Sequence, residues 1–310
     1  MPERILILKA VAAAFAVAAV LALLGRWPWR APRPGRVSAM SAVGVGAGLL
    51  VGCRLLSLSP HWPPQDVHDR WLFVLVPAVV LVEILAASVW LLRPLRAIIA
   101  AAAAPILLAA SVYVEDLAGP GSREWSTTTE ILVFAGLAVV LVANWKALDT
   151  LASRTNGRPV LLSLGLASAG AAVTIALSSY ATGGQAGLLL AGVLGGLALT
   201  PFLFFDPRSA SGAIGVGVVS LFALVVGGRF FGELATTHAA LLFFAPMLAW
   251  LPELPGIRRI DWRLRILAGV VLVVIPVTVA ATQAMSAHDA RGKASPNSVE
   301  GSRDDYANFK

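Results

Sequence analysis

The sequence predicts an all-α protein, specifically a polytopic integral membrane protein with about ten transmembrane helices. Ten apolar stretches within residues 4–285 are long enough, or nearly so, to cross a bilayer, because ~20 helical residues span the ~30 Å hydrocarbon core. Only 13% of the 310 residues are charged, whereas soluble domains carry about 25%. The loops between the stretches also alternate in positive charge, as the loops of multi-pass proteins do.

The ten stretches form one predicted transmembrane domain, residues 1–285. Their approximate bounds are 4–24, 37–58, 71–92, 96–114, 130–150, 158–180, 185–205, 211–232, 237–252 and 265–285. The fourth and ninth are short, and a re-entrant ninth stretch would move the carboxyl end to the other side. Five plus five spans permit an inverted repeat, although residues 1–152 and 158–285 share no matching signature. Residues 286–310 are polar and are predicted to be a disordered tail.

Loop charge predicts the orientation. The five odd-numbered loops hold 14 Lys and Arg residues and the four even-numbered loops hold 4, and such an excess marks the cytoplasmic side. Both termini are therefore predicted outside. None of the nine tryptophans lies at the centre of a predicted span, which agrees with the preference of Trp for membrane interfaces. An Arg-rich, Ala-, Gly- and Val-rich composition suggests a bacterial inner membrane.

The predicted partner is the lipid bilayer. The net charge of +7 does not indicate nucleic-acid binding, since most of the excess lies in the loops that set orientation. A basic inner face opposite anionic headgroups is the ordinary arrangement.

Glu83 is the main candidate for a functional residue. We place it near the middle of the third stretch, where an ionisable side chain costs at least ~2.5–3.5 kcal/mol and needs a partner, a proton or a water-filled cavity. Asn144 and Lys146 of the fifth stretch are expected at a similar depth. The three could form a proton or cation relay. Alternatively, Glu83 is neutral and bonded to a neighbouring helix, while Lys146 extends to the inner surface.

A second group of candidates lies on the predicted outer face. Its members are His61, Asp66, His68, Asp69, Glu115 and Asp116. Imidazole and carboxylate groups suit Zn²⁺, but their spacing matches no established zinc signature, and solvated loop polarity is the alternative. We therefore predict neither a metal nor a cofactor.

Glycines at four-residue spacing predict close helix packing. They are Gly44, Gly48 and Gly52 in the second stretch, Gly192 and Gly196 in the seventh, and Gly228 and Gly232 in the eighth. These faces could pack against other helices of the chain, against membrane-protein partners or in a homo-oligomer.

The motifs exclude some functions and leave three hypotheses. The sequence has no phosphate-binding Gly-Lys-Ser/Thr loop, no His-Glu-x-x-His and no Gly-x-Ser-x-Gly, so ATP hydrolysis is excluded and hydrolase chemistry has no support. The leading hypothesis is a small-molecule secondary carrier, and the main alternative is a non-catalytic membrane subunit or scaffold. The third is an enzyme acting on a lipid-linked substrate at the outer face.

One resemblance bears on the carrier hypothesis. A length near 300 and ten predicted spans are similar to carriers of the drug/metabolite transporter type. The similarity lies in length and span count alone, and the loop charges here predict termini on the side opposite to that group's usual arrangement.

Overall fold

The computed structural model describes residues 2–26, 34–58, 61–109, 111–115, 124–155, 157–203, 210–254, 257 and 261–294. Every regular element in these ranges is helical. The α-helices are α1 (Pro2–Arg26), α2 (Pro34–Leu55), α3 (Val67–Arg70), α4 (Val76–Ser88), α5 (Leu95–Leu108), α6 (Thr127–Arg154), α7 (Arg158–Leu177), α8 (Ala181–Leu203), α9 (Ser211–Phe230), α10 (Thr236–Phe244) and α11 (Trp262–Ala294). A π-helix, η1 (Trp71–Leu75), joins α3 to α4, and two 3₁₀ segments are η2 (Trp90–Leu92) and η4 (Ala245–Glu253).

Eight helical segments in the described chain are long and apolar enough to cross a membrane. They are Arg4–Gly25, Gly35–Leu55, Val67–Ser88, Thr127–Arg154, Arg158–Leu177, Ala181–Thr200, Ser211–Phe230 and Arg263–Arg291. The predicted fourth and ninth spans are different: α5 has only 14 residues, and the nine residues of α10 continue into the 3₁₀ segment η4. The all-helical multi-pass architecture is thus confirmed, whereas the count of ten spans and the five-plus-five arrangement are not.

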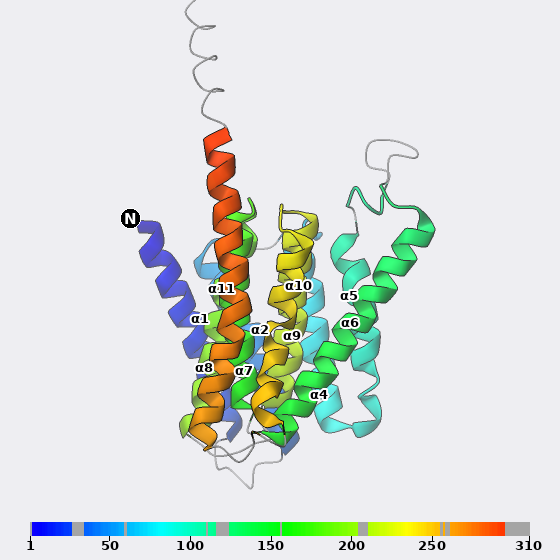
Figure 1. Cartoon of the computed structure of the whole chain (residues 1–310). Helices are drawn as coiled ribbons and strands as arrows, with labels where there is room; N and C mark the ends of the chain where they lie inside the picture. The colour runs from blue at the N-terminus through cyan, green and yellow to red at the C-terminus, as the bar shows by residue number, and fades with distance from the viewer. Residues whose placement is uncertain are drawn as a thin grey trace, which may run out of the picture.

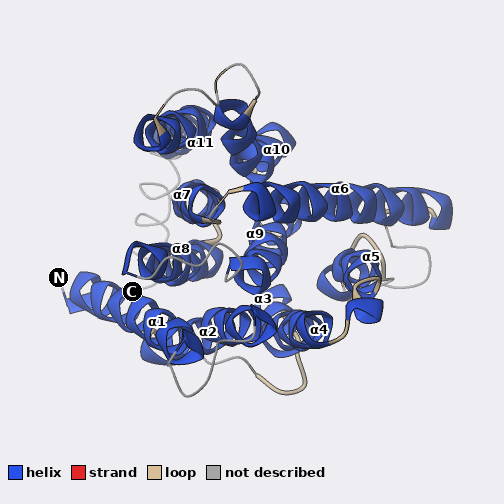
Figure 2. Ribbon diagram, turned by 90° about the horizontal axis from the view of Figure 1, so that it is seen from below, coloured by secondary structure: helices blue, strands red, loops and turns tan. Residues whose placement is uncertain are grey.

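Helix α9 is the centre of the bundle. Every residue from Gly212 to Gly228 is buried, and α2, α4, α6, α7, α8 and α10 lie around this helix (Figure 2). Helices α1, α6 and α11 instead leave large apolar side chains exposed, among them Leu8 at 70%, Val139 at 68% and Leu267 at 58%. Such surfaces suit a hydrocarbon environment, because lipid replaces water around them.

The two ends of the bundle differ in charge. We call the end at which α4 and α6 finish and α5, α7 and α9 begin the Arg-rich end, since Arg93, Arg96, Arg154 and Arg158 lie there. The first residues of α1 and the last of α11 both lie at the opposite end (Figure 1). Which side of a membrane each end faces remains the prediction from loop charge.

Besides the short segment η2, two parts of the described bundle are not regular α-helix. The segment Val67–Ser88 contains the π-helix η1, which ends two residues before Pro77, and π-turns inside helices are often found at functional sites. The nine residues of η4 exceed the usual length of a 3₁₀ run.

Helix α11 is longer than the sequence suggested. It continues to Ala294, so residues 286–294 of the predicted tail are helical. Residues 295–310 lie outside the described residues.

The predicted packing glycines lie against helices of the same chain. A Cβ built at Gly48 would lie 2.8 Å from the carbonyl oxygen of Ala14, and one at Gly192 would lie 2.8 Å from Val11 Cγ1. Both contacts are with α1. A Cβ would likewise meet close neighbours at Gly44, Gly52, Gly196, Gly228 and Gly232. Packing within the chain therefore accounts for these glycines without a partner.

Candidate functional site

Glu83 is fully buried, with 0% exposure. It lies in α4 five residues before the helix ends at Ser88, a distance of ~7.5 Å along the axis. The sequence placed it near the middle of a span because the apolar stretch continues to Leu92. The chain instead leaves the α-helix at Val89 and turns through η2. Glu83 is consequently nearer to the Arg-rich end than predicted.

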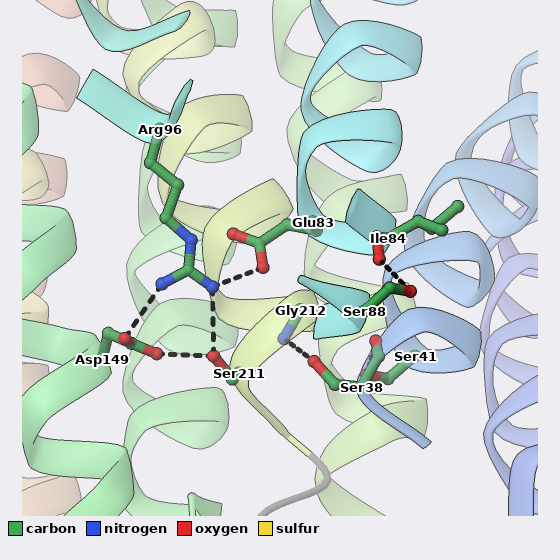
Figure 3. A network of polar contacts seen from close by, with 9 residues as sticks. All are labelled: Ser38, Ser41, Glu83, Ile84, Ser88, Arg96, Asp149, Ser211 and Gly212. Atoms are coloured by element: carbon green, nitrogen blue, oxygen red, sulfur yellow. Dashed lines mark hydrogen bonds and ion pairs between the residues drawn. The ribbon is translucent and has the colours of Figure 1, made fainter. Parts of the chain in front are cut away.

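The partner of Glu83 is Arg96, in the first turn of α5. Arg96 Nη2 lies 2.6 Å from Glu83 Oε2, and Nη1 lies 3.0 Å from Asp149 Oδ2 (Figure 3). The guanidinium also lies 5.7 Å from the ring centroid of Trp145. One planar cation thus joins a buried acid of α4 to a second acid of α6, a geometry that the fork of arginine suits and a lysine does not.

Serines at the start of α9 and of α2 extend this network. Ser211 Oγ donates to Asp149 Oδ1 at 2.6 Å and accepts from Arg96 Nη2 at 3.4 Å. The next N–H, of Gly212, donates to Ser38 Oγ of α2 at 2.9 Å, which satisfies a backbone donor that the helix start leaves open. Elements α2, α4, α5, α6 and α9 therefore meet at one polar cluster (Figure 3).

Gly215 allows Glu83 to approach α9. A Cβ at this position would overlap Glu83 Oε1 and would lie 2.8 Å from Trp145 Cζ2. Only glycine leaves that space for the carboxylate. Glu83 Oε1 itself has no hydrogen-bond partner among the described residues.

The charges of the network are unbalanced. Glu83 and Asp149 share the single guanidinium of Arg96, so the three groups carry one net negative charge when both acids are ionised. Bringing a charge into an apolar interior is costly unless it is paired. One added proton, or one added cation, would balance the cluster.

Two hollows flank the pair formed by Arg96 and Asp149. The polar cavity, of about 500 Å³, is lined by Gly35, Ser38, Ala86, Ala87, Arg93, Arg96, Asp149, Thr150, Ala152, Ser153 and Ser211. The α5–α6 groove, of about 440 Å³, is lined by Leu91, Arg93, Pro94, Arg96, Ala97, Val142, Trp145, Lys146 and Asp149. Since both linings include Arg96 and Asp149, this ion pair forms part of the wall between the two.

Asn144 and Lys146 do not contact Glu83. Asn144 Nδ2 donates to the carbonyl oxygen of Phe243 in α10 at 3.0 Å, and Lys146 is exposed along the α5–α6 groove. Sequence reasoning missed Arg96 and Asp149 because both were counted as loop charges. The turn at Pro94 was the available signal, since a tight turn between antiparallel helices brings Glu83 and Arg96 to similar depths.

Four of the predicted outer-face residues come together at the opposite end. His61, Asp66, His68 and Asp69 line a hollow of about 380 Å³ with Tyr180. Asp69 accepts from the backbone N–H groups of His61 at 3.2 Å and Gln65 at 3.4 Å, so it orders the loop.

The rest of that predicted group lies elsewhere. Glu115 is exposed in the turn after α5, and Asp116 lies outside the described residues. No three His, Cys, Asp or Glu side chains in the described part of the chain are placed to hold a metal ion. A zinc site therefore has no support among these residues.

No protein-family model, no curated protein and no solved structure matches this chain. The apolar helices indicate a multi-pass membrane protein, and its function must be argued from the site itself.

Proposed function

We propose that this multi-pass membrane protein is a small-molecule secondary carrier of a bacterial inner membrane, coupled to protons through Glu83. The observation that carries the proposal is a fully buried carboxylate joined by one arginine to a second acid that lines a polar cavity. In this proposal the Arg-rich end is cytoplasmic, as its loop charge predicts.

A purely structural role explains the network poorly. Replacing a buried ion pair by apolar residues of similar volume is often neutral or stabilising, so such a pair contributes little net stability. Here one cation is shared between two acids, and Glu83 Oε1 is left without a hydrogen bond in the described structure. Intramembrane acids of this kind characterise proton relays and substrate pathways.

Protonation of Glu83 provides a coupling step. The proton neutralises the carboxylate and breaks its ion pair, while Arg96 keeps its contacts with Asp149 and Ser211. Helix α4 is then no longer held electrostatically to α5 and can move relative to α5 and α6. The π-helix η1 within the same span is a natural place for that movement to be absorbed.

The polar cavity is the proposed solute site. Its volume of about 500 Å³ falls within the ~300–1,000 Å³ typical of small-molecule sites. Hydroxyl groups of Ser38, Ser153 and Ser211, together with the Arg96 and Asp149 charges, line it. These groups suit a small polar solute.

The second candidate is a non-catalytic membrane subunit or scaffold. Helix α11 projects beyond the neighbouring helices at the end opposite to the Arg-rich end (Figure 1), and its residues from Met285 to Arg291 are exposed. A projecting helix of this kind is available to a partner.

Cysteine accessibility tests the polar cavity that the carrier proposal requires. The chain has one cysteine, the buried Cys53, so Cys53→Ala provides a background. Ala87→Cys places a thiol in the polar cavity, and Ala135→Cys, on the exposed face of α6, is the lipid-facing control. A charged, membrane-impermeant thiol reagent should label Ala87→Cys from the Arg-rich side and leave Ala135→Cys unlabelled.

Coupling is tested with the same variants. In a carrier, the labelling rate of Ala87→Cys changes with pH by more than the ionisation of a free thiol explains, and Glu83→Gln abolishes that excess because the variant cannot exchange a proton. A rate that follows thiol ionisation alone, or an excess pH response that survives in Glu83→Gln, overturns the coupling role. Proteoliposomes containing a pH-sensitive dye and challenged with defined small solutes then test transport directly.

A further inference from the structure

The α5–α6 groove is open on the outer surface of the bundle. Its two helices lie at the periphery (Figure 2), and Leu91 on its rim is 75% exposed. Ala97 and Lys146 are exposed along it as well. In a membrane this surface faces lipid, so the groove is accessible to a bilayer component without any rearrangement.

The positive charge of the groove is not neutralised. Three cationic side chains, Arg93, Arg96 and Lys146, line it against one acid, Asp149. Asp149 is already engaged by Arg96 and Ser211. Arg93 and Lys146 form no ion pair with any residue in the described ranges, and both are exposed. Within the described structure, the groove therefore offers an anionic ligand two cations that no acid pairs.

Charged and apolar groups are separated along the groove. Arg93 and Arg96 lie at the Arg-rich end of α5, Lys146 lies about two turns before the end of α6, and Val142 lies one turn deeper than Lys146. Trp145, only 3% exposed, forms an apolar wall beside them. A ligand that fills this shape has an anionic head at the membrane interface and an apolar portion directed toward the bilayer centre.

We propose that the α5–α6 groove binds an anionic phospholipid. Its phosphate lies between Arg93 and Lys146, and an acyl chain runs over Ala97 and Val142 beside Trp145. Basic pockets between membrane helices bind anionic headgroups in this way. A free inorganic anion would satisfy the two cations but would leave the apolar half of the groove unused. This site does not depend on the proposed carrier function.

Lipid retention measures the proposal directly. The full chain is exchanged into mixed vesicles of phosphatidylglycerol and phosphatidylcholine, extracted in a mild detergent, and the lipid that co-purifies is identified by native mass spectrometry. The wild-type protein should retain phosphatidylglycerol in preference. Each cation near an anionic surface contributes about five-fold, so R93Q/K146Q should lower that preference roughly 25-fold.

Two further variants make the result specific. K9Q/R36Q removes the same charge at exposed positions outside the groove and should retain the lipid. Ala97→Trp fills the apolar half without changing charge and should also weaken retention, which covers the case in which R93Q/K146Q does not fold.

Three results overturn the proposal. One is equal retention of the two lipids by the wild type. Another is equal retention by R93Q/K146Q and K9Q/R36Q. The third is full displacement by inorganic phosphate together with unchanged retention in Ala97→Trp, which would identify a simple anion site.

Discussion

Replacement of Arg96 by methionine should destabilise the protein strongly. The change removes the only cation that contacts Glu83 among the described residues and leaves a carboxylate with 0% exposure in an apolar interior. Breaking a buried pair by removing one partner costs ~3–5 kcal/mol. At about 2 °C per kcal/mol for a large domain, the midpoint of thermal unfolding should fall by roughly 6–10 °C.

The reverse truncation should cost much less. Glu83→Gln leaves Arg96, whose side chain is 20% exposed, still paired with Asp149 at 3.0 Å, so about 1 kcal/mol is expected for the lost hydrogen bond. The double variant E83Q/R96M buries no unpaired carboxylate. It should therefore be more stable than R96M alone, with a coupling energy of about 2–3 kcal/mol.

Thermal unfolding in a mild detergent ranks these variants, with the loss of monodisperse protein as the measured signal. Arg93→Met is the matched control, because it removes a neighbouring arginine of the same end that has no described ion pair. Arg96→Lys keeps a positive charge at this position but lacks the forked guanidinium that joins both acids. Its unfolding midpoint should therefore lie between those of the wild type and R96M. Equal stability of R96M and R93M, or a double variant less stable than R96M, would refute the argument.

Three further outcomes follow from other contacts. Gly215→Ala should displace Glu83 and lower the midpoint of thermal unfolding. Gly136→Ala is the control, because nothing lies within 4 Å of the added carbon, and it should leave the midpoint unchanged. Equal effects of the two substitutions would contradict the steric argument. Asn144→Ala should cost about 1 kcal/mol and speed hydrogen exchange in α10, since it removes the 3.0 Å bond to Phe243; unchanged exchange would count against that link. Burial, with Asp66 and Asp69 nearby, raises the pKa of Tyr180 from 10.0 to about 12. As the pH rises, the unfolded state therefore loses this proton before the folded state does. The contribution of Tyr180 to the free energy of unfolding is fully present below pH 10 and should be lost between pH 10 and about 12. Tyr180→Phe should flatten this loss.

The helices were predictable because a bilayer imposes a simple rule. A spanning segment must satisfy its own backbone and present apolar side chains, and eight of the predicted stretches meet that rule as long helices. The exceptions, α5 and α10 with η4, are short or not fully α-helical. Hydropathy averages over a window, so it does not distinguish an α-helix of 14 residues from one that continues to span.

The site was only partly predictable. Glu83 was found because an acid in an apolar stretch is conspicuous, and its burial required a partner. The partner was not found, since matching depth along two straight spans selected Asn144 and Lys146. The early end of α4 at Ser88 and the turn at Pro94 bring Arg96 into reach instead. Such a local departure from straight helices leaves little signal in composition.

The basic residues of the Arg-rich end have more than one role. A count of loop charges treats them all alike and does not reveal these roles. Arg96 is held between two acids, Arg154 lies 5.3 Å from the Trp250 ring, and Arg265 contacts Glu253 at 3.0 Å. Arg93 and Lys146 have no such partner in the described residues.

An interface is where a membrane protein can keep a charge at low cost and still place it within reach of a buried group. Glu83 lies ~7.5 Å from the end of its helix, close enough for Arg96 to reach from that interface. The proposed proton path is correspondingly short and begins in the polar cavity. Beyond this cavity, α9 is buried from Gly212 to Gly228 by the helices packed around it. A carrier in this state would therefore be open at the Arg-rich end, and the ion pair of Glu83 with Arg96 would hold it there until a proton arrives.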